Sequence, residues 1–98
     1  MEDVKLNLHE NGEGKFSIND GNEELGEMVV AVSGKNLTVY HTEVAPKAEG
    51  RGLAKKMFGE MVQYARKNGL KVIARCPYVA AQLQRHPNEF ADIWDKGA

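Results

Sequence analysis

The spacing of apolar residues changes once along this chain, near Pro46. Before that residue, apolar side chains alternate with polar ones, which is the period of half-buried strands. Four such runs are separated by short turns and lie at residues 4–8, 16–18, 25–33 and 37–44. Because short links join neighbouring antiparallel strands, we predict a four-stranded antiparallel meander.

After Pro46, apolar residues recur every three or four positions between residues 53 and 65, which predicts a helix with one apolar face. Two basic residues and then Asn68-Gly69 mark its end. The apolar run at residues 70–76 predicts a fifth strand. A strand, a helix and a second strand form a right-handed crossover, so the fifth strand should lie parallel to the fourth.

Two prolines organise the remaining residues. Pro77 suits the first position of a helix that runs to about His86, and Pro87 suits the start of a short terminal helix that ends at Trp94. We therefore expect an α+β fold in the order β-β-β-β-α-β-α, followed by the terminal helix. A chain of 98 residues fits one hydrophobic core, so we expect residues 1–98 to form a single domain.

Composition excludes several classes of function. The net charge of -1 argues against a general nucleic-acid binder, so any phosphate binding must be local. The longest apolar run, residues 28–32, is too short to span a bilayer, and the first residues do not resemble a secretory leader. The single cysteine cannot form an intrachain disulfide, and three scattered histidines show no metal-ligand spacing. We expect a cytoplasmic protein that binds neither membrane nor metal.

The segment between the fourth strand and the long helix has the sequence Glu49-Gly50-Arg51-Gly52-Leu53-Ala54, which we call the cradle. Backbone amides at a helix start can bind a phosphate, and the helix dipole favours a negative charge there. Four basic residues and one acidic residue give positions 47–56 a local charge of +3. A solvated helix start with a glycine turn is the alternative interpretation.

Two familiar glycine motifs do not fit the cradle. A P-loop needs a lysine and a hydroxyl residue after its second glycine, where Leu53-Ala54 stand here. A dinucleotide fingerprint needs a third glycine at position 55, which is Lys55, and a doubly wound parallel sheet.

Read as Val44-x-Pro46-x-x-x-Gly50-x-Gly52-x-Ala54, the segment resembles the acetyl-CoA site of the GNAT N-acetyltransferase superfamily. The resemblance implies that cradle amides hold the coenzyme pyrophosphate and that the pantetheine arm lies where the fourth and fifth strands diverge. It also implies that Lys56 and other nearby cations assist with the phosphates. The residues expected to bind the coenzyme are Val44, Lys47, Glu49, Gly50, Arg51, Gly52, Leu53, Ala54 and Lys55.

The chain departs from the family pattern in two places. Glu49 stands where the family usually has arginine or glutamine, which brings a carboxylate near the phosphates. The link between the first two strands, residues 10–15, replaces the pair of helices that wall the acceptor site in typical members. We therefore expect a shortened member whose acceptor site is open or is completed by a partner chain.

Acetyl transfer to an amine needs a base, a donor for the carbonyl oxygen and support for the leaving thiolate. The resemblance implies that a strand amide near Val44 serves the carbonyl and that Glu43 fits the usual base. His41 shares a strand face with Glu43 by alternation, and an imidazole ordinarily titrates near neutrality, so His41 is the better base on chemistry alone and is placed slightly ahead of Glu43. Both also fit as polar residues on a solvent-facing strand.

The usual acid of the family is a tyrosine in the helix after the fifth strand, and Leu83 occupies its position here. Tyr78 and Cys76 remain nearby as candidates. A Cys76 thiol beside a helix start could accept the acetyl group in a covalent relay, whereas a lone cysteine at the end of an apolar strand is also typical of a small core residue.

The hypothesis favoured by these residues is an acetyl-CoA-dependent N-acetyltransferase that acts by direct attack of an amine, on either a small molecule or a protein. A non-catalytic acyl-CoA-binding or sensor module is the main alternative. An enzyme that carries acetyl on Cys76 is the third.

Overall fold

The protein is described by a computed structural model over residues 3–97. Residues 1–2 and 98 of the expected domain lie outside the described range. The elements in chain order are β1 (Val4–Leu8), β2 (Glu13–Asp20), β3 (Glu23–Ser33), β4 (Asn36–Val44), the 3-10 turn η1 (Pro46–Ala48), α1 (Leu53–Lys67), β5 (Lys71–Ala74) and α2 (Pro77–Arg85).

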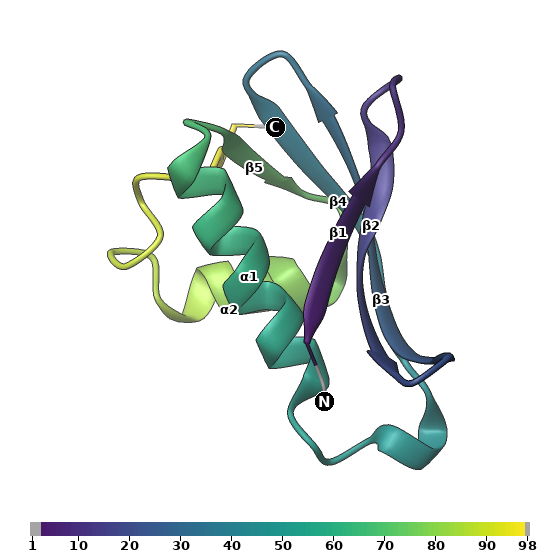
Figure 1. The fold of residues 1–98 in the computed structure, drawn as a ribbon. Helices are drawn as coiled ribbons and strands as arrows, with labels where there is room; N and C mark the ends of the chain where they lie inside the picture. The colour runs from purple at the N-terminus through teal and green to yellow at the C-terminus, as the bar shows by residue number, and fades with distance from the viewer. Residues whose placement is uncertain (1–2, 98) are drawn as a thin grey trace.

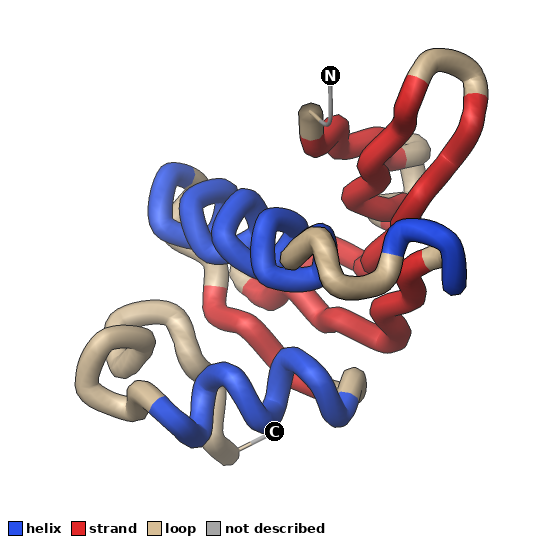
Figure 2. The backbone as a smooth tube through the Cα atoms, turned by 90° about the horizontal axis from the view of Figure 1, so that it is seen from below, coloured by secondary structure: helices blue, strands red, loops and turns tan. Residues whose placement is uncertain are grey.

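The five strands form one sheet in sequence order, β1-β2-β3-β4-β5 (Figure 1). Strands β1 to β4 pair with one another in antiparallel fashion, and β5 runs parallel to β4 with Leu37 opposite Val72. Figure 2 shows how the parallel pairing is reached, because the chain leaves β4 through η1, follows a loop and enters α1 before returning as β5. Both the predicted meander and the predicted crossover are confirmed.

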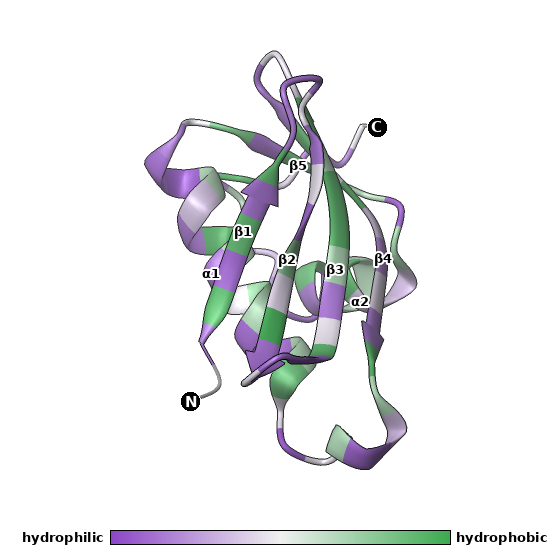
Figure 3. Ribbon diagram, turned by 45° about the vertical axis from the view of Figure 1, so that its right-hand side comes forward, coloured by the Kyte–Doolittle hydropathy of each residue, from purple (hydrophilic) through white to green (hydrophobic). Residues whose placement is uncertain are grey.

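One face of the sheet packs against α1. Polar and apolar bands alternate along β1 and β2 (Figure 3), as expected for strands with one buried face. Phe16 of β2 meets Tyr64 of α1 edge to face, with ring centroids 6.1 Å apart. Met57 and Met61 of α1 are fully buried, which accounts for the apolar helix face seen in the sequence.

The C-terminal segment differs from the prediction. Residues 87–94 form turns and an isolated bridge to β5 in place of the expected helix. The amide of Val72 donates to the carbonyl of Ile93, and the amide of Asp95 donates to the carbonyl of Val72 at 2.9 Å. The free edge of β5 thus satisfies backbone groups that a helix would have paired internally.

Candidate functional site

Strands β4 and β5 diverge halfway along β4. Their ladder ends at the pair Val39–Ala74, because the amides of Arg75 and Cys76 both donate to the Val39 carbonyl, at 2.9 and 3.0 Å. The fifth strand was predicted at residues 70–76, whereas β5 spans only Lys71–Ala74. Strand β4 continues to Val44 paired with β3 alone, so a V opens between it and the chain that leads into α2.

A β-bulge lies at the point of divergence. Val30 pairs with Val39 and Val29 pairs with His41, which leaves Tyr40 as the extra residue. Its side chain is 53% exposed. A bulge shifts the alternation of side chains by one position. The side chains of β4 that face the core are therefore at odd-numbered positions before the bulge and at even-numbered positions after it.

His41 and Glu43 project on the side of the sheet away from α1. Their neighbour Val44 faces α1, because a Cβ built at Gly26 would lie 3.1 Å from Met57 Cε and 3.6 Å from Val44 Cγ2. His41 Nε2 is 3.6 Å from Glu43 Oε1, and the two side chains are 56% and 67% exposed. The two candidate bases thus share one open face, as alternation predicts.

The ladder between β3 and β4 also sets the direction of main-chain groups in the V. The amide of Ala45 donates to the carbonyl of Leu25 at 2.8 Å, which makes these residues a hydrogen-bonded pair. Hydrogen-bonded and non-hydrogen-bonded pairs alternate along an antiparallel ladder. The amides of Thr42 and Val44 are therefore directed away from β3 and into the V.

The cradle follows η1 and opens onto the N-terminus of α1. Gly50 and Gly52 have φ angles of 88° and 74°, a region that other residues adopt only at a cost. The first α1 hydrogen bond runs from the Lys56 amide to the Gly52 carbonyl. No side chain in the described part of the chain caps this helix end, and its first turn holds no acid. The amides at the start of α1 therefore remain available to an anion.

A hollow of about 370 Å³, which we call the cradle hollow, joins the cradle to the V. It is lined by residues 48–55 except Arg51, together with Val44 and Tyr78. Most of the predicted coenzyme-binding residues thus meet at one place. Lys47 is directed elsewhere, since its ammonium pairs with Glu23 of β3. Glu49 does line the hollow and brings a carboxylate to it.

Cys76 lies at the inner end of the V. Its side chain is 2% exposed, and its sulfur is 3.3 Å from the Thr42 hydroxyl. His41 does not face this sulfur, because it projects from the side of the sheet away from α1, whereas Cys76 contacts Thr42. The sulfur is thus part of the core, as expected for a small buried residue.

Tyr78 sits at the start of α2, where it contacts Phe58 edge to face at 6.5 Å between centroids. Burial raises the pKa of its phenol above the ordinary value, so the group stays protonated at neutral pH. Leu83, at the position of the usual family tyrosine, is fully buried in the core.

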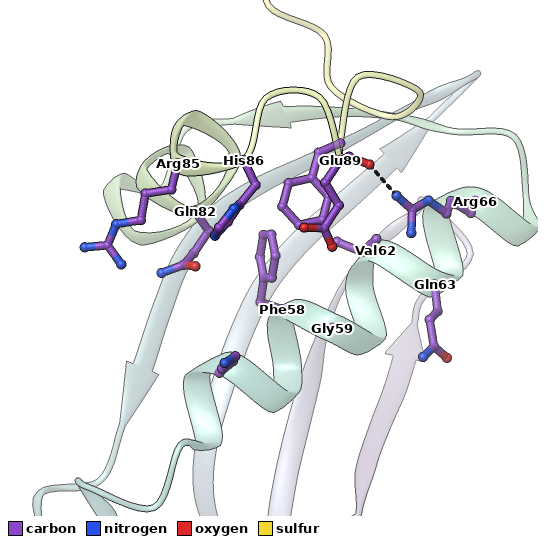
Figure 4. A pocket seen from close by; sticks show the side chains of 11 residues that line it. Phe58, Gly59, Val62, Gln63, Arg66, Gln82, Arg85, His86 and Glu89 are labelled. Atoms are coloured by element: carbon purple, nitrogen blue, oxygen red, sulfur yellow. Dashed lines mark hydrogen bonds between the residues drawn. The ribbon is translucent and has the colours of Figure 1, made fainter.

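A larger hollow of about 590 Å³, the helix groove, lies between α1 and α2 (Figure 4). Lys55 lines both hollows and so connects them. Phe58 points from α1 into the groove, and its ring meets that of Phe90 at 5.3 Å. Arg85 and His86 of the α2 end complete one side. This groove was not predicted from the sequence, although Lys55 and Phe58 are three residues apart on one helix and therefore share a face.

Within residues 3–97, no group of histidine, cysteine and acidic side chains could hold a metal ion. None of the helices that the structure describes is long and apolar enough to cross a membrane.

Comparison with known proteins agrees with this architecture. Residues 15–93 match the family model described as GCN5-related N-acetyl-transferase. The chain therefore belongs to the GCN5-related N-acetyltransferase family. The comparison with curated proteins found no match.

The chain is similar to several solved structures. A GCN5-like protein from Staphylococcus aureus, named as a candidate N-acetyltransferase, is 30% identical with a TM-score of 0.69, over 97% of this chain and 91% of that one. Nourseothricin acetyltransferase is 26% identical with a TM-score of 0.58, over 84% of this chain and 52% of that one. The ribosomal-protein-S18-alanine N-acetyltransferase from Escherichia coli shares the fold, with 13% identity and a TM-score of 0.66. The match covers 82% of this chain and 54% of that one. The chain thus spans about half the length of the latter two.

Proposed function

We propose that this chain binds acetyl-CoA in the cradle and the V and transfers the acetyl group to an amine. The observation that carries the proposal is the continuity of the cradle hollow. It leads from an uncapped helix start, shaped by two left-handed glycines, to Val44 and Tyr78, which stand on the two sides of the V.

The cradle supplies what a pyrophosphate needs. Free amides at the start of α1 can donate to phosphate oxygens, and the positive end of the helix dipole adds to the attraction. Lys55 stands beside them and can neutralise part of the phosphate charge. Glu49 opposes this, so the proposal relies on main-chain donors more than on side-chain charge.

The helix groove suits the nucleotide end of the coenzyme. Lys55 joins it to the cradle hollow, so a ligand can pass from one to the other beside a single cation. The rings of Phe58 and Phe90 offer apolar surface to a purine, and Arg85 adds a second positive charge.

The V suits the reacting end. An acyl carbonyl that lies along β4 can accept a hydrogen bond from the Val44 amide, which is directed into the V. The amine attacks the carbonyl carbon, loses a proton to His41 or Glu43 on the open face, and becomes an amide when the carbon–sulfur bond breaks. The released thiolate then takes a proton from solvent to give coenzyme A.

Tyr78 is the candidate donor to the leaving sulfur, because it lines the cradle hollow with a protonated phenol. Its raised pKa lies above that of an ordinary thiol, so full proton transfer would be uphill. We therefore assign it a hydrogen bond that stabilises the thiolate, and not complete protonation.

The second candidate function is a non-catalytic acyl-CoA-binding or sensor module. The burial of Leu83 at the usual acid position favours it, since no tyrosine acts there. The relay through Cys76 receives no support, because its sulfur is buried against Thr42.

An NMR titration with acetyl-CoA tests the binding step. We expect shifts at Val44, at residues 49–55 and at Tyr78, whereas shifts elsewhere only would contradict the proposal. Thiol release with a panel of amines tests the transfer step. Tight binding with no release across the panel would favour the module, and an acetyl adduct on Cys76 by intact mass would revive the relay.

A further inference from the structure

A side-chain contact joins the two sides of the V, deeper in the V than the residues that line the cradle hollow. The V has two arms, which are β4 and the chain that leads from β5 into α2. Val44 on the first arm and Tyr78 on the second both line the hollow. Two positions inward on each arm stand Thr42 and Cys76, and their Oγ1 and Sγ atoms are 3.3 Å apart. This contact bridges the V and leaves no space between the arms at that level.

Main-chain hydrogen bonds fix the backbone next to the Thr42–Cys76 contact. Just beyond it, the amides of Arg75 and Cys76 converge on the carbonyl of Val39, whose side chain is fully buried. Cys76 is itself 2% exposed, so its sulfur cannot swing outward without opening the core. A group that enters from the cradle therefore meets a fixed wall, formed by the Thr42 side chain and the Cys76 sulfur.

We propose that the Thr42–Cys76 pair is the end wall of the acyl pocket and restricts the donor to a short acyl group, with acetyl preferred over propionyl and butyryl. This inference rests on the proposed function, because it assumes that the thioester end of the donor lies in the V. Each added methylene would have to displace packed atoms or point out of the V. One misfitting methylene changes specificity by about tenfold or more.

Calorimetric titration of the folded chain with four probes tests the inference: coenzyme A, acetyl-CoA, propionyl-CoA and butyryl-CoA. We expect the wild type to bind acetyl-CoA about tenfold or more tightly than butyryl-CoA. Thr42→Ala and Cys76→Ala each remove part of the wall and should reduce this ratio at least about fivefold, with the affinity for coenzyme A unchanged.

Two further variants separate wall volume from other effects. Thr42→Val keeps the volume and loses the hydroxyl, so it should retain the preference for acetyl. Thr38→Ala makes the same truncation on β4 outside the V, where Thr38 pairs with Ile73, and should also retain it. An amide spectrum of each variant checks that the fold is intact.

The outcomes distinguish the two proposals. Binding of coenzyme A with no length preference in the wild type, or a preference that survives in both alanine variants, would overturn the end wall alone. Failure of coenzyme A itself to bind would overturn the proposed function and the end wall with it.

Discussion

Arg66 holds the carboxylate of Asp92 through two hydrogen bonds, from Nε to Oδ2 at 2.9 Å and from Nη2 to Oδ1 at 3.3 Å. The same Nη2 donates to the Glu89 carbonyl at 2.7 Å (Figure 4). These contacts tie the turns after α2 to α1, and so they hold Phe90 against Phe58 in the helix groove.

Asp92→Asn should therefore lower thermal stability and weaken its dependence on acid pH. The hydrogen bond from Arg66 lowers the pKa of Asp92 below 3.8, so this pair stabilises the fold above that pH and loses its effect as pH falls through the folded pKa. Thermal unfolding between about pH 2 and pH 7 measures the effect. Identical pH profiles for the variant and the wild type would show that the Arg66–Asp92 pair does not stabilise the fold.

Gly50→Ala should destabilise the protein by about 1 kcal/mol and also weaken acetyl-CoA binding. The cost is conformational, because φ is 88° and a Cβ would meet no atom within 4 Å. Gly34→Ala is the matched control, since Gly34 has a φ of 58°, equally open surroundings and a place in the turn between β3 and β4, at the opposite end of β4 from the cradle. Chemical denaturation and calorimetry separate the two effects. Equal losses of affinity in both variants would argue that the cradle does not bind the coenzyme.

Lys55→Ala should weaken acetyl-CoA binding about fivefold and flatten its dependence on salt. Lys55 lines both the cradle hollow and the helix groove, so its charge lies beside the expected path of the phosphates. Lys35→Ala, in the turn between β3 and β4, removes the same charge at a distance and should leave affinity nearly unchanged. Titrations at two salt concentrations would show whether the two variants differ.

Tyr78→Phe should lower kcat about tenfold with little change in KM, provided that the chain turns over. A hydrogen bond to the leaving sulfur acts in the transition state and not in the ground state. The ring contact with Phe58 survives the change, which limits any structural effect. If KM rose and kcat did not fall, Tyr78 would be a binding residue only.

Leu83→Tyr should not restore a general acid, and it should destabilise the protein by about 1 to 3 kcal/mol. Leu83 is fully buried, so a larger ring with a hydroxyl would overpack the core. Denaturant unfolding and a thiol-release assay measure the two effects. A stable variant with faster turnover would show that the site can accept the usual family acid.

Several elements could be predicted from the sequence because their causes are local. The α1 boundaries follow from apolar spacing and from Asn68-Gly69 at its end. The terminal helix expected at residues 87–94 was wrong for a non-local reason. Ile93 and Asp95 found hydrogen-bonding partners at Val72 on the β5 edge, and this edge lies more than twenty residues earlier in the chain.

The sequence by itself determined the order of elements, the crossover and the glycines whose left-handed φ angles shape the cradle, because residue type and spacing decide these features within a few positions. Only the tertiary structure decided which side chains of β4 enter the V. The bulge at Tyr40 shifts the alternation, so that Thr42 meets Cys76 while His41 and Glu43 face outward. That shift depends on how β4 pairs with β3, and no spacing within β4 encodes it.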